Sequence, residues 1–254
     1  MKIITYNVNG VRAAIKKGLV AWLEAVGADV VCLQEVKAEE HQVDLTGFAR
    51  LGYTHIYWHS AEKKGYSGVA ILAKQPALQV TYGIGLPHYD REGRVLKIDL
   101  ADCSIINAYH PSGTTGQERQ QFKYEWLDDF YAYAQQVRRD YPNLIMCGDY
   151  NICHKPIDIH NPVSNKNSSG FLPQERAWFD KLVDNGWVDT FRQFSQAPHQ
   201  YTWWSNRPGV RERNLGWRID YHLINEPMRP RLANCQILDQ VFFSDHCPVL
   251  LELQ

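Results

Sequence analysis

The stretch FFSDHCPVLLEL, residues 242–253, joins a polar pair, Asp245 and His246, to an apolar run that reads as a β-strand beginning at Pro248. One interpretation is that the polar pair forms only a turn in front of that strand. The other is that it lies at the end of a sheet, where a side chain can reach a ligand rather than the core. Polar residues follow apolar, strand-like runs at several other places in the chain. The order of these runs predicts the fold.

Seven more short runs have the composition of strands, and Gly, Asn, Asp or Pro flank them, as is common at strand ends. They cover residues 2–6, 28–35, 67–74, 94–100, 104–110, 143–149 and 218–225. Apolar residues spaced three or four apart predict helices over residues 15–26, 122–137 and 173–183. Many strands with few helices predict an α/β fold in which two packed sheets carry helices on their outer faces. We see no linker or low-complexity tract, so we expect one domain over residues 1–254.

The composition limits the classes of protein. A formal net charge of -1 excludes a uniformly basic nucleic-acid binder but allows a local basic patch. The six cysteines form no C-x-x-C pair, which indicates buried free thiols in a reducing compartment rather than disulfides or a zinc site. The N-terminal MKIITYNVNG reads as a strand rather than a signal peptide, and no stretch could span a membrane. We expect a soluble cytoplasmic monomer.

Polar side chains stand where the apolar runs end. They are Asn7, Glu35, Tyr109, Asp149, Asn151, Asp220, Asp245 and His246. One acid at a strand end is commonly only a turn or cap, but so many are hard to explain in that way. Carboxylate and amide oxygens are hard ligands that suit Mg²⁺, or Mn²⁺ in its place, and they favour Glu35 as a metal ligand. The histidines show no spacing typical of a zinc site.

The same residues indicate a hydrolytic reaction. An imidazole in catalysis needs a carboxylate that fixes its tautomer, and Asp220 could serve His246 in this way. Asp149 is then left to activate a water molecule. The chain has no G-x-S-x-G elbow, no Walker A segment and no G-x-G-x-x-G. Hydrolysis by a metal-activated water therefore fits best.

Several segments together resemble the exonuclease III family of apurinic/apyrimidinic (AP) endonucleases. They are NVNG (7–10), LQE (33–35), GYSG (65–68), GDYN (148–151), NPVSNKNSSGFLPQER (161–176), GWRIDY (216–221) and SDHCP (244–248). The match is collinear over nearly the whole chain. The resemblance implies a four-layer α/β sandwich of the DNase I-like type, with two mixed sheets flanked by helices. It also implies Mg²⁺-dependent cleavage of duplex DNA on the 5′ side of an abasic site, which leaves a 3′-hydroxyl, and trimming of 3′ ends as an exonuclease or phosphodiesterase.

The resemblance also implies roles for individual residues. Glu35 would bind the metal, with help from Asn7 and Asp245. Asp149 would orient or deprotonate the attacking water, with Asn151 beside it. His246, oriented by Asp220, would contact the scissile phosphate, which Tyr109 and Asn165 would also hold. Both Tyr109 and Asp149 are plausible partners of the nucleophile, and the sequence leaves that choice open.

Aromatic and basic residues are candidates for binding DNA. Trp203, Trp217 and Ile219 could be core residues, but the resemblance makes them the walls of a pocket for a flipped-out abasic sugar, which a full nucleotide would not fit. Residues 201–218 contain four Arg (207, 211, 213 and 218) against one Glu. Arg12, Lys37 and Tyr66 are further expected to contact the substrate, with basic contacts that weaken as salt rises.

The chain departs from the animal-type members of this family after Tyr109. Ser112 and Thr114 stand where those members have an Asn and an Arg that contact DNA, so the balance of endonuclease and exonuclease activity is open. Two other functions remain as alternatives. One is a phosphoesterase of the same fold that acts on inositol phosphates or sphingolipid, although it would not require the GWRIDY segment. The other is a silent binding module, which would not need to retain Glu35, Asp149 and His246.

Overall fold

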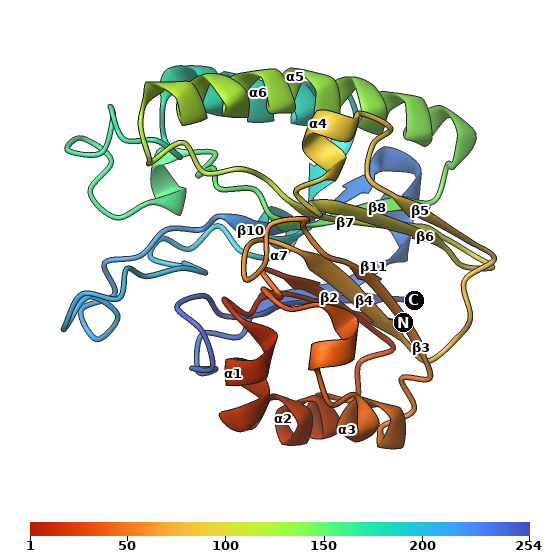
Figure 1. Ribbon diagram of the computed structural model, residues 1–254. Coiled ribbons are helices and arrows are strands. Elements are labelled where there is room, and N and C mark those ends of the chain that lie inside the picture. Colours follow the sequence, from red (N-terminus) through yellow and green to blue (C-terminus); the bar gives the residue numbers. More distant parts are fainter.

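The computed structural model describes residues 1–254, in which two six-stranded sheets pack face to face with helices on both outer sides (Figure 1). The first sheet has the spatial order β11 (Leu232–Ile237), β12 (Val249–Leu253), β1 (Lys2–Asn7), β2 (Val30–Gln34), β4 (Val69–Ala73), β3 (His55–His59). The second has the order β5 (Gln79–Tyr82), β6 (Val95–Asp99), β7 (Ser104–Tyr109), β8 (Leu144–Asp149), β10 (Asp220–Asn225), β9 (Trp187–Asp189). Each sheet contains one parallel pair, β1 with β2 and β7 with β8, so both are mixed. The predicted fold class is confirmed.

Helices cover the two outer faces (Figure 1). The first sheet is covered by α1 (Val11–Lys16), α2 (Leu19–Val26) and α3 (Thr46–Arg50), and the second by α4 (Pro87–Asp90), α5 (Gln117–Asp140) and α6 (Pro173–Asp184). The short α7 (Thr190–Phe194) contacts β10 and β11, and short 3-10 helices cover Glu40–Gln42, Pro156–Asp158 and Glu226–Arg231. Helices α5 and α6 were predicted correctly. The single helix predicted over 15–26 was wrong, because Gly18 takes a φ of 110° and separates α1 from α2.

The core between the sheets contains 21 buried residues, most of which lie on strands of the two sheets. Polar bonds fix how the sheets lie on each other. The Gln34 Nε2 donates to Asn107 Oδ1 at 2.7 Å, and Asn107 Nδ2 donates to the carbonyl oxygens of Leu33 and Ala70 at 3.0 and 2.9 Å. A buried amide is costly unless it is paired, so these bonds favour one relative position of the sheets.

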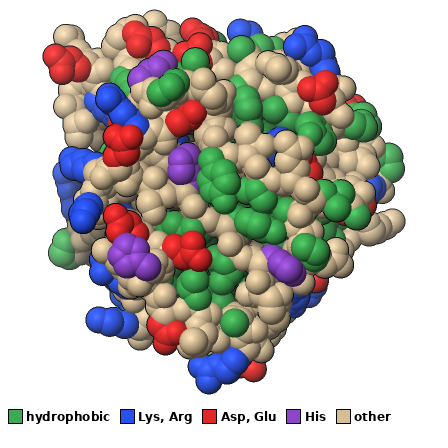
Figure 2. Space-filling model, turned by 45° about the vertical axis from the view of Figure 1, so that its right-hand side comes forward, with side chains coloured by type: hydrophobic (Ala, Val, Ile, Leu, Met, Phe, Trp, Pro, Cys, Tyr) green, Lys and Arg blue, Asp and Glu red, His purple; other side chains and the backbone are tan.

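One side of the sandwich carries the edge strands β3 and β5, and it comes forward in Figure 2. Hydrophobic side chains form a band across the middle of that face, while many Lys and Arg side chains lie toward its margins (Figure 2). Leu78 and Tyr82 are 76% and 52% exposed. None of the helices is long and apolar enough to cross a membrane.

The strand ends opposite the termini bring the predicted polar residues to one place. In the parallel pairs, β1 and β2 end together, and β7 and β8 end together. The antiparallel β10 begins at this level, so Tyr109 and Asp220 each lie opposite Asp149. Ligands commonly bind beyond the carboxyl ends of parallel strands.

Candidate active site

Three of the predicted residues form a compact cluster at the strand ends. Glu35, Asp149 and His246 each offer a ligand atom, and these atoms lie within 4.8 Å of one another. The Asn7 Nδ2 donates to Glu35 Oε1 and to Asp149 Oδ2, at 2.9 Å each. The two carboxylates come from different sheets, and Asn7 therefore fixes them against each other. In this arrangement the amide nitrogen of Asn7, rather than its oxygen, faces the carboxylates.

The carboxylates of Asp220 and Asp149 surround His246. The Asp220 Oδ2 lies 2.9 Å from His246 Nδ1, and Asp149 Oδ2 lies 3.9 Å from His246 Nε2. Burial alone would lower the pKa of His246, but Asp220, followed by Asp149 and Asp245, raises it to about 10. The imidazole is therefore a cation at neutral pH, with Nε2 directed toward the carboxylate cluster.

The other titratable groups of the cluster have shifted pKa values as well. Burial, and after it the Asp220 carboxylate, raises the pKa of Asp149 to about 7. Burial would also raise the pKa of Glu35, but the Lys37 ammonium, 2.8 Å from Glu35 Oε2, outweighs it and holds the pKa below its usual range. Burial and the Glu35 carboxylate raise the pKa of Tyr109 well above 10. At neutral pH, Glu35 is thus an anion, Tyr109 is a neutral donor, and Asp149 can exchange a proton.

The backbone around this cluster is locally strained. Glu35 and Lys37 have φ angles of 49° and 50°, in the left-handed region that residues other than Gly, Asn and Asp avoid. Asn9 and Asn151 lie in the same region, with φ angles of 43° and 51°, which Asn tolerates. Strained residues of this kind gather at functional sites, where the surrounding structure holds them in place. The Asn151 N–H donates to Asp149 Oδ1 at 2.8 Å, so the turn after β8 orients the Asp149 carboxylate.

A cavity of about 430 Å³ opens beside the cluster. Its lining residues are Glu35, Tyr109, Ser112, Thr114, Asp149, Asn151, Ser168, Ser169, Gly170, Trp203, Trp217, Ile219, Asp245 and His246. The rings of Trp203 and Trp217 meet edge to face, with centroids 5.8 Å apart. The Asp245 carboxylate accepts bonds from Trp203 Nε1 at 3.1 Å and Asn9 Nδ2 at 2.9 Å. The predicted pocket walls thus line one cavity together with four of the five predicted catalytic residues, Tyr109, Asp149, Asn151 and His246. The fifth, Asp220, lies behind His246 and outside the lining.

Four predicted substrate-binding residues lie outside that lining. Arg12 is exposed on α1, and Lys37 is bound to Glu35. Tyr66 lines a neighbouring cavity, where Arg94 Nη2 and Arg119 Nη2 donate to its hydroxyl at 2.8 and 2.9 Å. The Asn165 amide nitrogen donates to the carbonyl oxygens of His160 and Asn161, at 2.9 and 3.1 Å. Contacts of these residues with a substrate stay predictions.

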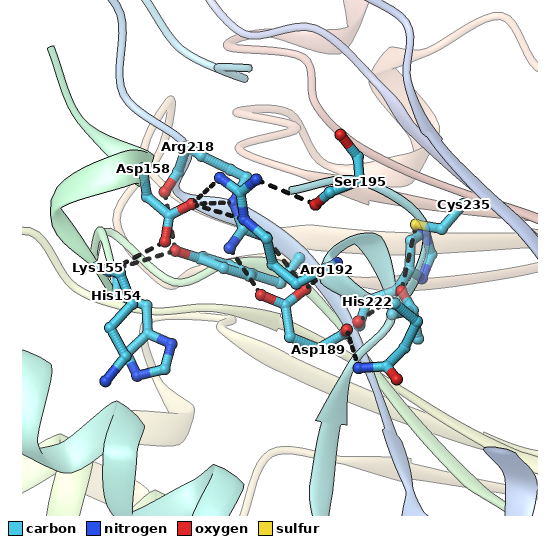
Figure 3. Close-up of polar contacts among 12 residues, drawn as sticks. His154, Lys155, Asp158, Asp189, Arg192, Ser195, Arg218, His222 and Cys235 are labelled. Atoms are coloured by element: carbon cyan, nitrogen blue, oxygen red, sulfur yellow. Dashed lines mark hydrogen bonds and ion pairs between the residues drawn. The ribbon is translucent and has the colours of Figure 1, made fainter. Parts of the chain in front are cut away.

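The expectation that Arg218 lies along the DNA backbone is wrong. Arg218 is 1% exposed and is bound between two carboxylates, which Figure 3 shows. Its Nε lies 2.7 Å from Asp158 Oδ1, and its Nη2 lies 2.6 Å from Asp189 Oδ2. Sequence alone could not distinguish this Arg from its exposed neighbours Arg207 and Arg213, because its two partners come from distant segments.

Sequence reasoning missed Thr202, which lies directly behind the Asp220 and His246 pair. The Thr202 Oγ1 donates to Asp220 Oδ2 at 2.6 Å and accepts from the N–H groups of Ile219 and Asp220, at 3.0 and 3.1 Å. Asp220 therefore has a second donor that fixes its orientation. Of the residues beside Thr202 in the sequence, only Trp203 is a predicted site residue.

Comparisons with known proteins agree with this site and fold. The model of the endonuclease/exonuclease/phosphatase family matches residues 4–246. The chain is 41% identical over 253 residues to an exodeoxyribonuclease of Bacillus subtilis, covering 99% of this chain and 98% of that protein. It is 39% identical to a DNA repair nuclease of Danio rerio, covering 100% of this chain and 82% of that protein. The solved structure of an AP endonuclease from Archaeoglobus fulgidus superposes with a TM-score of 0.91 at 31% identity, covering 100% and 99% of the two chains.

These matches confirm the resemblance and the enzyme class that the motifs predicted. The family match includes the residues that form the carboxylate and imidazole cluster, and the match to the Bacillus subtilis protein extends over 99% of this chain. The chain belongs to the endonuclease/exonuclease/phosphatase family of hydrolases.

Proposed function

We propose that the protein is a Mg²⁺-dependent DNA repair nuclease that hydrolyses the phosphodiester 5′ to an abasic site in duplex DNA and leaves a 3′-hydroxyl. We include trimming of 3′ ends, as an exonuclease or phosphodiesterase, in the same proposal. One observation carries it: the cluster of Glu35, Asp149 and His246 shares a cavity with the apolar walls Trp203 and Trp217. The relatives named as an exodeoxyribonuclease and a DNA repair nuclease support DNA as the substrate.

The protonation states support distinct roles for the polar residues. Asp149, with a pKa of about 7, can orient a water molecule and accept its proton near neutral pH. His246 is protonated and can donate from Nε2 to a phosphate oxygen that gains charge in the transition state. Asp220 holds the imidazole by Nδ1, as a carboxylate does in other acid-base pairs. Tyr109 keeps its proton and fits a donor to phosphate better than a base.

The donor set fits Mg²⁺. Glu35 and Asp149 supply carboxylate oxygens, and Asp245 lines the same cavity with its carboxylate. Hard divalent cations prefer such oxygens and keep several waters. When bound, Mg²⁺ would stabilise negative charge on the phosphate and lower the pKa of a bound water. Glu35 is the best candidate ligand, because its pKa is held low and it stays ionised.

The apolar walls support selection of an abasic site. Trp203, Trp217 and Ile219 leave a cavity that suits a sugar without its base, and extrusion of such a nucleotide breaks no base pair. We further propose that residues 1–254 act as one domain and as a monomer, without a membrane partner. All six cysteines are free, which supports a reducing compartment such as the cytoplasm.

The test is incision of a labelled duplex that carries one abasic-site analogue, beside an intact duplex, with Mg²⁺, with Mn²⁺ and with EDTA. We expect metal-dependent cleavage of the lesion strand only, with a 3′-hydroxyl at the nick. An intact duplex with a recessed 3′ end tests the trimming activity. No incision with either metal would refute the proposal and move the function to another phosphoester, such as an inositol phosphate or a sphingolipid.

A further inference from the structure

A fully buried ion pair lies behind the candidate active site. Lys123 on α5 and Glu175 in the first turn of α6 are both 0% exposed, and Lys123 Nζ lies 2.5 Å from Glu175 Oε1. Moving two charges out of water is costly, and a well-packed apolar pair would often be as stable. Neither residue touches the cavity, so the reaction itself does not account for them.

Each member of the pair makes a second bond to the backbone of the site. The Lys123 Nζ donates to the carbonyl oxygen of Asn151 at 2.8 Å. The Glu175 Oε2 accepts from the N–H of Gly170 at 2.6 Å and from the N–H of Leu172 at 2.9 Å. The pair thus joins the turn after β8 to the segment around Gly170, which lies nearly twenty residues further along the chain.

The positions of the two backbone partners, Asn151 and Gly170, affect the active-site cavity. Asn151 has a φ of 51°, and its N–H orients the Asp149 carboxylate. Gly170 has a φ of 95°, and a Cβ there would lie 2.9 Å from the Trp217 ring and 3.1 Å from the Asn151 carbonyl oxygen. A small shift of either segment would therefore change the distance between Asp149 and the Trp217 wall.

The pair is not required to join the two helices. Apolar side chains of α5 and α6, among them Trp126, Leu127, Phe179 and Leu182, belong to one buried cluster, and Trp178 Nε1 donates to the Leu127 carbonyl oxygen at 2.7 Å. What the charges add is a directed bond to each loop, since a buried ammonium and carboxylate bind backbone groups more strongly than neutral side chains do.

We propose that Lys123 and Glu175 are a positioning pair, which fixes the Asp149–Asn151 turn against the Gly170–Trp217 wall and so sets the rate of the chemical step rather than the affinity for DNA. This inference rests on the proposed nuclease function. A misplacement of about 1 Å at a catalytic group can cost about 100-fold in rate, whereas binding spread over a large surface is less sensitive.

The test compares Lys123→Met, Glu175→Gln and the double variant with the wild-type protein. Single-turnover incision of the abasic duplex gives the rate. Titration of the same DNA with the protein, in the presence of EDTA so that the DNA is not cleaved, gives the dissociation constant. We expect the rate to fall about 10- to 100-fold in Lys123→Met and in the double variant, with the dissociation constant changed by less than about twofold. The double variant should regain thermal stability, because no unpaired charge remains buried, but not the rate.

Lys97→Met is the matched control, since Lys97 forms a buried pair with Asp99 in β6, and neither residue lines the cavity. It should lose stability and keep the rate. The inference is overturned if the double variant recovers rate and stability together, or if Lys97→Met loses the rate equally. Glu175→Gln keeps the size of the side chain but leaves Lys123 without its carboxylate, so we expect its rate to fall as in Lys123→Met. Failure of the wild-type protein to incise would instead refute the proposed function.

Discussion

Replacing His246 with Asn removes a cation that lines the cavity and can donate to a phosphate. The imidazole is 4% exposed and bound to Asp220, so its charge acts in a site from which water is largely excluded. The shorter Asn side chain can keep one bond to Asp220 but does not reach the position of Nε2. We therefore expect His246→Asn to fold and to lose most of its activity.

The size of the loss follows from the role of a preorganised donor. Removing one such donor to a transition state costs about 3 to 4 kcal/mol, which corresponds to roughly 100- to 1000-fold in kcat. The pKa of about 10 means that the donor is fully protonated from pH 6 to 8, roughly, so the loss should be similar across that range. Binding of the DNA should change little, because most of the contact surface remains.

The assay is single-turnover cleavage of a labelled abasic duplex with enzyme in excess. The matched control is His154→Asn, which removes a buried imidazole that is bound to Asp180 at 2.8 Å and lies outside the cavity. It should cleave at the wild-type rate, and circular dichroism should show that both variants are folded. Turnover of His246→Asn close to that of His154→Asn would refute the assignment of His246 as the phosphate donor.

Three further substitutions test the parts around the cluster. Thr202→Val removes the second donor to Asp220, and we expect about 1.5 to 3 kcal/mol less stability in urea unfolding and a slower kcat with an unchanged Kd, whereas Thr202→Ser should restore both. Gly170→Ala forces a Cβ against Trp217 at a φ of 95°, so discrimination between abasic and intact duplex should fall in competition assays; unchanged discrimination would argue against this wall. Burial would raise the pKa of Asp158, but the Arg218 guanidinium outweighs it and lowers the pKa to about 2. The Asp158 carboxylate therefore stabilises the folded state at pH values above about 4, the pKa of Asp in the unfolded chain, and this contribution is lost as the pH falls toward 2. Unfolding free energies of Asp158→Asn should therefore depend less on pH between about 4 and 2 than those of the wild-type protein, by about 2 kcal/mol.

The sequence predicted the interior of each sheet and missed its edges. The eight predicted strands are the four inner strands of each sheet, and the missed ones, β3, β5, β9 and β11, are the four edge strands. An inner strand is covered on both faces and reads as a continuous apolar run, as β4 does. An edge strand is partly exposed, as in β5, whose first and last residues are exposed, or it is very short, as in β9. Its composition therefore resembles that of a loop.

The candidate site was predictable where its residues follow the inner strands. Asn7, Glu35, Tyr109, Asp149 and Asp220 stand at ends that the strand pattern locates, so their meeting follows once the strands are paired. Whether an arginine is buried or exposed was not predictable in this way. Arg218 is buried because Asp158 and Asp189 reach it from other segments, and no local pattern carries that information.

The buried pair behind the site did leave a trace in the helical pattern. Lys123 precedes Trp126 and Leu127 by three and four residues, and Glu175 precedes Trp178 and Phe179 by the same steps. Residues at this spacing share one face of a helix, so each charge lies in line with the residues that pack on the sheet. A single charge in such a place would be expected to destabilise the fold, but two opposite charges on the packed faces of two neighbouring helices can meet. Two opposite charges within the apolar stripes of neighbouring helices therefore predict a buried ion pair, and this possibility should be tested before the charges are assigned to the surface. In this chain the predicted pair is Lys123 with Glu175, and Lys123 also binds the carbonyl oxygen of Asn151.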